Sequence, residues 1–221
     1  MILRKLPYLL LFFIGLSHAS AAAEDNQIWS SARLRYISPQ NVKVDLIQHL
    51  RWDQNASSFL SAMPELRMKL SPSDGASVGI GYRLIHKRSG SGDFESAHRV
   101  QLNGEIERSF GQLSAAYRLQ GQTRYEPDAQ RFDTSLRNRV ALTVDTSSKF
   151  TPLLSVESFV DHTDEGLQNS HLRSSLGTAV KISKPHRFKV RYHHDVSLDG
   201  SSDIERILVM DYQYRYKASS D

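Results

Sequence analysis

The 221-residue sequence contains no cysteine, so it has neither a disulfide framework nor thiol chemistry. Proline and glycine are sparse, with 7 and 12 residues, which argues against a collagen-like chain or a disordered one rich in these residues. After residue 24 there is no apolar run of the roughly 20 residues that a transmembrane helix needs. The chain must therefore be stabilised by its own hydrogen bonding and packing, or by a membrane.

An apolar run does occur at the N-terminus, where Arg4 and Lys5 precede residues 6–16 and a small-residue segment at 19–23. This order predicts a secretory signal peptide over residues 1–23, cleaved after Ala21 or Ala23. The alternative of an uncleaved membrane helix is disfavoured, because the run has about half the length needed to span. The remaining chain is divided into a barrel domain, 24–217, and a short polar tail, 218–221.

The charge of the exported chain is nearly balanced. Of 28 basic residues, Arg4 and Lys5 leave with the signal peptide, so 26 basic residues face 24 acidic ones and the net charge is +2. This excess is too small to indicate a nucleic-acid partner.

Alternation of apolar and polar residues dominates the rest of the sequence. It is clearest in residues 113–144, where two alternating segments flank a polar loop at 126–133, and the polar positions carry arginines. A period of two predicts β-strands, because successive side chains point to opposite faces. The segments with this period are 28–37, 42–52, 58–70, 76–86, 97–108, 113–125, 135–144, 150–161, 170–182, 187–196 and 204–216.

Most of these segments have 10 to 14 residues, which is enough for the roughly 9–11 of a transmembrane strand. Long polar connections, such as 87–96 and 162–169, are expected to alternate with short turns, such as 71–75. Bacterial single-chain barrels normally have an even number of strands. Ten or twelve strands are therefore expected, with 28–37 outside the wall or a twelfth strand overlooked.

The choice between a soluble and a membrane barrel depends on which face is outward, because both give alternation. Aromatic residues near the ends of the apolar faces fit interfacial girdles and favour the membrane barrel. They are Trp52, Tyr82, Tyr117, Tyr125, Phe150, Tyr192, Tyr212 and Tyr216. Polar residues at a few apolar-face positions are tolerable mainly near an interface; they are Ser30, Gln48, Asn138, Ser158 and Arg206. We predict an all-β protein, a transmembrane antiparallel up-and-down β-barrel of about 10–12 strands.

With the apolar face outward, the lumen is crowded with charges of both signs. The candidate lumen residues are Arg33, Arg35, Arg51, Arg67, Arg83, Arg99, Glu105, Arg118, Arg124, Arg137, Arg139, Glu157, Arg173 and Arg191. The favoured interpretation is a packed interior of arginine–carboxylate pairs that fixes the strand register, since arginine bonds carboxylates bidentately. The alternative is a basic lumen that admits anions.

No catalytic or metal-ligating residue is predicted. A membrane acyl hydrolase would need a serine and a histidine within hydrogen-bond reach on the outer face. His86, His98 and His194 have the outward parity, with Ser158 or Ser174 as possible partners, but nothing in the spacing links them. No metal-ligand spacing is found, because neighbouring histidines on a strand point to opposite faces, and no cofactor is expected.

Several short patterns, in this order and spacing over nearly the whole exported chain, resemble the DUF2490 family. They are Trp29-Ser30-Ser31, Tyr82-Arg83, Arg118 and Arg124 with Tyr125-Glu126, Leu136-Arg137-Asn138-Arg139, Pro152 followed by Glu157 and Phe159, and Arg173 with Gly177. That family comprises bacterial proteins assigned to the outer-membrane β-barrel group, so the resemblance implies an outer-membrane location and brings no catalytic residue. The chain departs from the wider barrel class in that residues 217–221 follow Tyr216, where an aromatic commonly ends such chains.

These observations predict a monomeric outer-membrane barrel, either structural or a narrow pore with a basic, ion-pair-filled lumen. Its expected partners are outer-membrane lipid and the barrel-assembly machinery, and no nucleic acid. Two alternatives stay open: an outer-membrane lipid-modifying enzyme of acyl hydrolase or transferase type, and a soluble periplasmic lipocalin-like binder.

Overall fold

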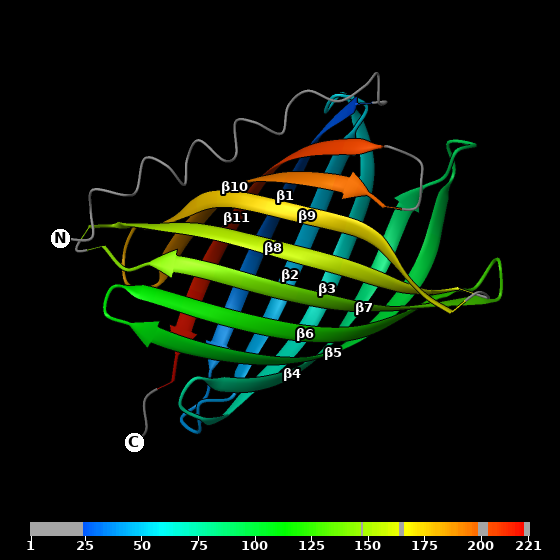
Figure 1. Ribbon diagram of the computed structural model, residues 1–221. Helices are drawn as coiled ribbons and strands as arrows, with labels where there is room; N and C mark the ends of the chain where they lie inside the picture. The colour runs from blue at the N-terminus through cyan, green and yellow to red at the C-terminus, as the bar shows by residue number, and fades with distance from the viewer. Residues whose placement is uncertain (1–23, 147, 164–165, 199–202, 219–221) are drawn as a thin grey trace.

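The computed structural model describes residues 24–146, 148–163, 166–198 and 203–218, which form a closed barrel of eleven β-strands (Figure 1). The strands are β1 (Glu24–Ile37), β2 (Lys43–Asp53), β3 (Ser58–Ser73), β4 (Ala76–Arg88), β5 (Phe94–Phe110), β6 (Leu113–Glu126), β7 (Arg131–Val144), β8 (Phe150–Thr163), β9 (Gly166–Lys181), β10 (His186–Ser197) and β11 (Ile204–Lys217). The predicted all-β barrel is confirmed. The predicted signal peptide and residues 219–221 of the predicted tail lie outside the described residues. Among the residues that are described, no helix has the length and apolar character needed to cross a membrane.

The barrel closes through a parallel pair of strands. β1 pairs with β2 in antiparallel register and with β11 in parallel register, from Glu24 opposite Ile204 to Ile37 opposite Lys217. The predicted antiparallel barrel of about 10–12 strands is confirmed, but the expectation of an even number, ten or twelve, is wrong, and one pair is parallel. Because consecutive strands alternate in direction, an odd number leaves the first and last strands pointing the same way. Closure between them must then be parallel, and β1 is a full member of the wall.

In two connections expected to be long loops, at least half of the residues belong to strands. β4 continues to Arg88 and β5 begins at Phe94, while β8 continues to Thr163 and β9 begins at Gly166. The polar residues there pair with the neighbouring strand, as in the register partners Lys87 and Glu95. That pairing satisfies their backbone hydrogen-bonding groups whatever the side chains are. Predicting loops from polar side chains alone therefore made these strands too short.

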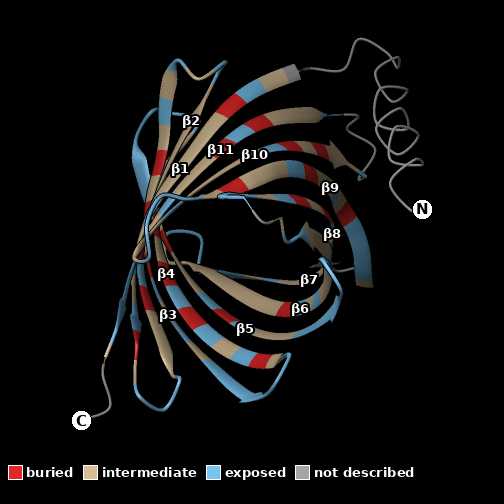
Figure 2. Ribbon diagram, turned by 90° about the vertical axis from the view of Figure 1, so that its left-hand side faces the viewer, coloured by how far each residue is buried: buried red, intermediate tan, exposed pale blue. Residues whose placement is uncertain are grey.

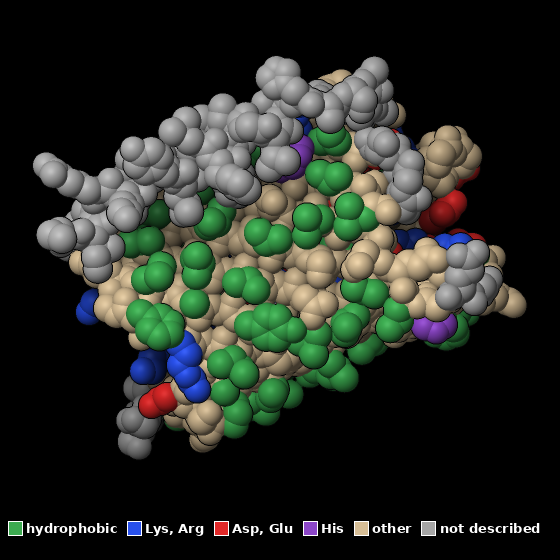
Figure 3. Space-filling model, in the orientation of Figure 1, with side chains coloured by type: hydrophobic (Ala, Val, Ile, Leu, Met, Phe, Trp, Pro, Cys, Tyr) green, Lys and Arg blue, Asp and Glu red, His purple; other side chains and the backbone are tan. Residues whose placement is uncertain are grey.

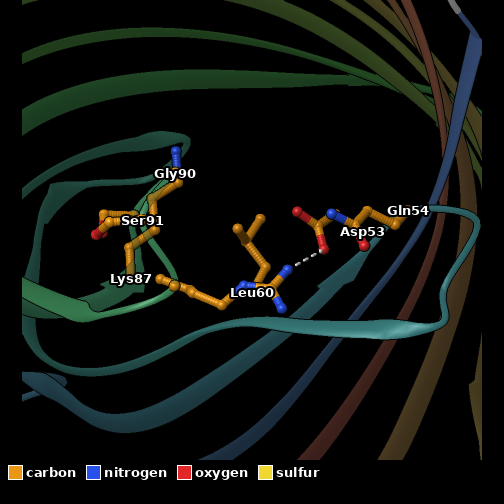
Figure 4. A pocket seen from close by; sticks show the side chains of 9 residues that line it. Asp53, Gln54, Leu60, Lys87, Gly90 and Ser91 are labelled. Carbon is orange, nitrogen blue, oxygen red and sulfur yellow. Dashed lines mark hydrogen bonds and ion pairs between the residues drawn. The ribbon is translucent and has the colours of Figure 1, made fainter.

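A β-bulge changes the facing of side chains where β2 meets β3. The register shifts between Arg51 and Trp52, so that Trp52 lies opposite Phe59 and Arg51 lies opposite Ser61. Phe59 and Trp52 pack edge to face on the outer face, with ring centroids 5.8 Å apart. Leu60, which shares the parity of the outward Leu66 and Leu70 in the alternating segment 58–70, instead lines a cavity inside the barrel mouth (Figure 4). An extra residue in one strand reverses the alternation beyond it, and the sequence pattern carried no sign of it.

The outer surface of the barrel is apolar. Leu102, Leu176 and Val140 are among many large hydrophobic side chains that are more than half exposed, whereas buried positions recur at alternate residues along the same strands (Figure 2). Hydrophobic side chains cover the visible wall, and charged side chains gather toward its ends (Figure 3).

Aromatic residues collect at both ends of the outer face. Near the β2–β3, β4–β5 and β6–β7 connections, Trp52, Phe59 and Phe94 form one contiguous group, and Tyr125 stacks on Phe132. At the opposite end, Tyr36 stacks on Tyr216, and Phe110 and Phe150 are more than half exposed.

Candidate functional site

All fourteen candidate lumen residues lie at half-buried or buried positions, on the strand face opposite the exposed apolar residues. Several of their contacts join strands that are not neighbours in the sheet. Arg118 on β6 bonds Glu157 on β8, and Glu105 on β5 pairs with Lys69 on β3, at 2.8 Å in both cases. Contacts that pass over an intervening strand are possible only inside the barrel wall.

Glu65 on β3 is the most heavily bonded carboxylate, and its side chain is fully buried. It accepts hydrogen bonds from His49 on β2 (3.0 Å), from both Arg67 and Arg83, and from Gln101 on β5 (2.8 Å). Two guanidinium forks and two further donors therefore share one negative charge. This is the kind of satisfied network that a buried carboxylate requires.

Gly81 makes the bond between Gln101 and Glu65 possible. Gly81 lies on β4, between β3 and β5, and a Cβ at this position would lie 2.8 Å from the Gln101 amide nitrogen. The missing side chain lets Gln101 reach across β4. Gln101 also accepts a hydrogen bond from Gln120 at 3.2 Å, so the polar network continues to β6.

Other carboxylates hold arginines in smaller groups. Glu157 accepts from Arg118 at 2.8 Å and from Arg137 at 3.1 Å. Asp195 pairs with Arg173. The other candidate lumen arginines with an ion-pair partner are Arg33 and Arg35 with Asp45, Arg191 with Asp211, and Arg124 with Glu126.

An alternating series of arginine and aromatic side chains crosses the lumen. Arg51 lies over the ring of Trp29 at 3.7 Å, and Arg173 lies 5.0 Å from the same ring and 4.9 Å from that of Phe159. Arg137 lies 4.4 Å from the centre of the Phe159 ring and ends the series. We call Arg51, Trp29, Arg173, Phe159 and Arg137 the cross-lumen stack; all its distances lie in the range of cation–π attraction.

The stack joins opposite walls, since β2 and β7, which carry its two ends, are separated by at least four strands in either direction. Trp29 and Phe159 were not identified as site residues from the sequence. The sequence signal that could have found them is the parity of their positions. It places both side chains on the inner face with the arginines and not on the apolar face.

Some lumen arginines have no acid at ion-pair distance. Within the part of the chain that the structure describes, this holds for Arg51, Arg99 and Arg139. The Nε atoms of Arg99 and Arg139, like those of Arg118, Arg124 and Arg191, are buried and have no hydrogen-bond partner among the described residues. The lumen therefore carries positive charge that its own carboxylates leave uncompensated.

The outward histidines bond locally to their strand neighbours. His86 bonds Ser96 at 2.9 Å, and His98 bonds Tyr82 at 2.7 Å. His194 lies in register with Ser174, and no hydrogen bond between the two is found among the described residues. The Ser96–His86 pair has the separation of a nucleophile and its base, but no carboxylate orients the second ring nitrogen in the described chain. Nor do the described residues contain a group of three histidines or acids that could hold a metal ion.

Two cavities open at the barrel end formed by the β2–β3, β4–β5 and β6–β7 connections. The first, of about 420 Å³, contains the ion pair of Asp53 and Arg88 and is lined by Leu60 (Figure 4). The second, of about 270 Å³, is lined by Ile85, Ala97 and Arg124 among others.

A comparison with curated proteins found no match. A comparison with family models matched residues 26–203, a span that holds nearly all of β1 and the whole of β2 to β10 and stops just before β11. The matched residues include the Glu65 network, the cross-lumen stack and both cavities. The chain therefore belongs to the family described as protein of unknown function DUF2490.

Proposed function

We propose that this protein is an outer-membrane β-barrel whose lumen is closed by the cross-lumen stack. The observation that carries the membrane location is the inverted arrangement of polarity: the outer face is apolar and the inner face holds the charges. In a soluble barrel the apolar face is inside. In an outer-membrane barrel an apolar band of about 25 Å faces lipid.

The two aromatic groups support this location. Trp52 belongs to one group, and Val44, eight residues away on β2, is the register partner of Tyr36 in the other. Eight residues span about 26 Å along a strand, or about 20 Å along the axis at a typical tilt near 40°. That separation is close to the thickness of the apolar band, so both groups can lie at membrane interfaces.

Membrane location is tested by fractionation and gel mobility. We expect the protein in the outer-membrane fraction, released only by detergent, with an apparent size that changes on heating. Recovery in the soluble periplasmic fraction with heat-insensitive mobility would contradict the proposal and favour a lipocalin-like binder.

Closure is tested by conductance in planar bilayers. We expect no wild-type conductance, because the stack fills the lumen. Replacing Trp29 and Phe159 with alanine should remove the aromatic members and raise the conductance. The matched control is Trp52→Ala with Tyr82→Ala, which removes two outward aromatic residues and should leave the conductance unchanged.

A narrow anion-preferring pore is the second candidate, favoured by the uncompensated charge of Arg51 and Arg99. It predicts measurable wild-type conductance and a reversal potential that favours chloride over potassium in a salt gradient. Absence of current in all salts would rule it out and leave the closed barrel.

A further inference from the structure

Gln48 on β2 places an amide in the middle of the apolar outer wall. Its side chain shares the outward face of Leu46 and is exposed. It lies four residues from Trp52 in one aromatic group and four from Val44, the register partner of Tyr36 in the other. Four residues correspond to about 10 Å along the barrel axis at a strand tilt near 40°. A polar residue on this face was expected near an interface, but Gln48 lies midway between the two aromatic groups.

The Gln48 amide has hydrogen-bonding capacity that its own barrel leaves unused. Among the described residues, its Nε2 donates one bond, to the backbone carbonyl of His49 at 3.0 Å, and its Oε1 accepts none. A primary amide carries two N–H donors and an oxygen with two lone pairs. Asn138 on β7 also carries an outward amide, but its Oδ1 accepts from the Tyr117 hydroxyl at 2.9 Å. In lipid the Gln48 oxygen would have no donor at all, which is costly for a polar group.

Short side chains adjoin Gln48 on both neighbouring strands. Two are its register partners on β1 and β3, and two are the next outward residues of those strands on the side of Trp52. They are Ala32, Pro64, Ser30 and Ala62. No long side chain in register on either strand shields the amide, so another apolar wall can approach it closely. Small residues allow the same close approach where membrane helices pack together.

We propose that the face formed by Gln48 and these four short residues is where a second copy of the chain docks within the membrane. A two-fold axis along the membrane normal brings Gln48 against Gln48 of the partner subunit, because such a contact is isologous. A primary amide is complementary to itself, since each Nε2 can donate to the other Oε1. The inference rests on the proposed function, because only a wall that faces lipid keeps water from the amide.

The depth of Gln48 favours a second copy over lipid as the occupant. Lipid headgroups lie at the interfaces, about 10 Å away along the axis, and acyl chains have no hydrogen-bonding group. Another copy of this chain in the same orientation carries the matching amide at the same depth. The monomer expected from the sequence would leave the amide in hydrocarbon.

Cross-linking tests the contact, because the natural chain has no cysteine. Gln48→Cys places a thiol on the proposed axis, so oxidation of isolated outer membranes should give a disulfide-linked dimer. Asn138→Cys is the matched control, since it replaces an outward amide on the opposite wall and should stay monomeric. Equal cross-linking of the two variants would indicate random collision and overturn the contact.

The role of the amide is tested by the dimer dissociation constant of the purified, folded barrel in detergent, measured by sedimentation. Gln48→Leu removes both hydrogen bonds between the copies, so the constant should rise about tenfold or more. Ala32→Phe keeps the amide but should also weaken the dimer, because the ring holds the walls apart. Asn138→Leu should leave the constant unchanged, since that amide bonds Tyr117 within its own barrel.

Wild-type protein that is monomeric at every concentration would overturn the interface. A dimer unaffected by Gln48→Leu, or a different protein bound at this face, would overturn it as well. A folded, heat-modifiable barrel that stays monomeric refutes only the interface, whereas a soluble, heat-insensitive protein refutes the proposed function.

Discussion

Glu65 shows how single residues stabilise this interior. Its carboxylate, on β3, is bonded by side chains of β2, β3, β4 and β5, so one acid ties together four adjacent strands. A strand displaced by one residue would turn the inward side chains outward. The bonded acid therefore helps to specify the register as well as to offset the arginine charge.

Neutralising this acid should destabilise the barrel strongly. Glu65→Gln leaves Arg67 and Arg83 buried without their carboxylate, and removal of one member of a buried ion pair costs about 3–5 kcal/mol. The control is Glu105→Gln. Glu105 accepts from Lys69 alone, and both side chains are about a quarter exposed, so we expect a smaller loss than for Glu65. Urea titration of the folded barrels measures both changes, and equal losses would contradict the central role of Glu65.

Reversing the charge of two lumen arginines should affect the yield of folded barrel differently. Arg137→Glu places a carboxylate beside Glu157 and removes one end of the cross-lumen stack, so we expect little folded protein. Arg99→Glu places a carboxylate between Arg83 and Arg124, where it gains two partners, so we expect a normal yield. The yield of heat-modifiable barrel measures both variants. Tolerance of Arg137→Glu would argue against its inward placement.

At the scale of the strands, the close approach of neighbouring backbones limits which side chains fit. Gly177 on β9 lies against β10, and an added Cβ would lie 2.2 Å from the Val190 carbonyl oxygen and 2.7 Å from Arg191 Cγ. Because the first contact is with backbone, β10 would have to shift. Gly177→Ala should therefore reduce the yield of folded barrel sharply. Gly121→Ala is the control, since a Cβ at Gly121 meets nothing within 4 Å. Normal folding of Gly177→Ala would show that β9 and β10 lie farther apart.

The parallel pairing of β1 with β11 can be tested by cross-linking, because the natural chain has no cysteine to interfere. Ser30 and Met210 are register partners, so cysteines at both positions are within disulfide reach. Oxidation should give a cross-linked barrel. Ser30→Cys with Tyr214→Cys, displaced by four residues or about 13 Å, should not cross-link. A cross-link in the second pair alone would refute the register.

Most of the strand positions could be predicted from the sequence, because one face of each strand meets the lumen and the other meets the outer surface. These two environments impose the alternation seen around Arg137 and Arg139. Closure could not be predicted, since nothing in residues 28–37 distinguishes a parallel neighbour from an antiparallel one. The facing of Leu60 was missed because a bulge depends on how two strands pair. The carboxylate partners of the arginines were missed for a similar reason. Arg118 and Glu157 are 39 residues apart, and their contact depends on the curvature of the whole wall.

At the scale of the whole molecule, the lumen combines a filled interior with local excess of positive charge. The Glu65 network, the cross-lumen stack and the separate ion pairs together account for all the candidate lumen arginines except Arg99 and Arg139. Arg99 is different, because its neighbours in register are both arginines and no acid lies at ion-pair distance from it among the described residues. The two interpretations that the sequence left open therefore apply to different parts of one lumen.

The odd number of strands also determines how the chain is threaded through a membrane. β1 and β11 run in parallel, so the residue that begins the barrel, Glu24, and the residue that ends it, Lys217, emerge on opposite sides. If the barrel spans the outer membrane with Lys217 toward the periplasm, the N-terminus that the predicted signal cleavage would leave at the start of β1 is carried through to the cell exterior during assembly. An epitope placed just before β1 would then be accessible to antibody on intact cells, whereas the same epitope after β11 would be accessible only after the outer membrane is permeabilised.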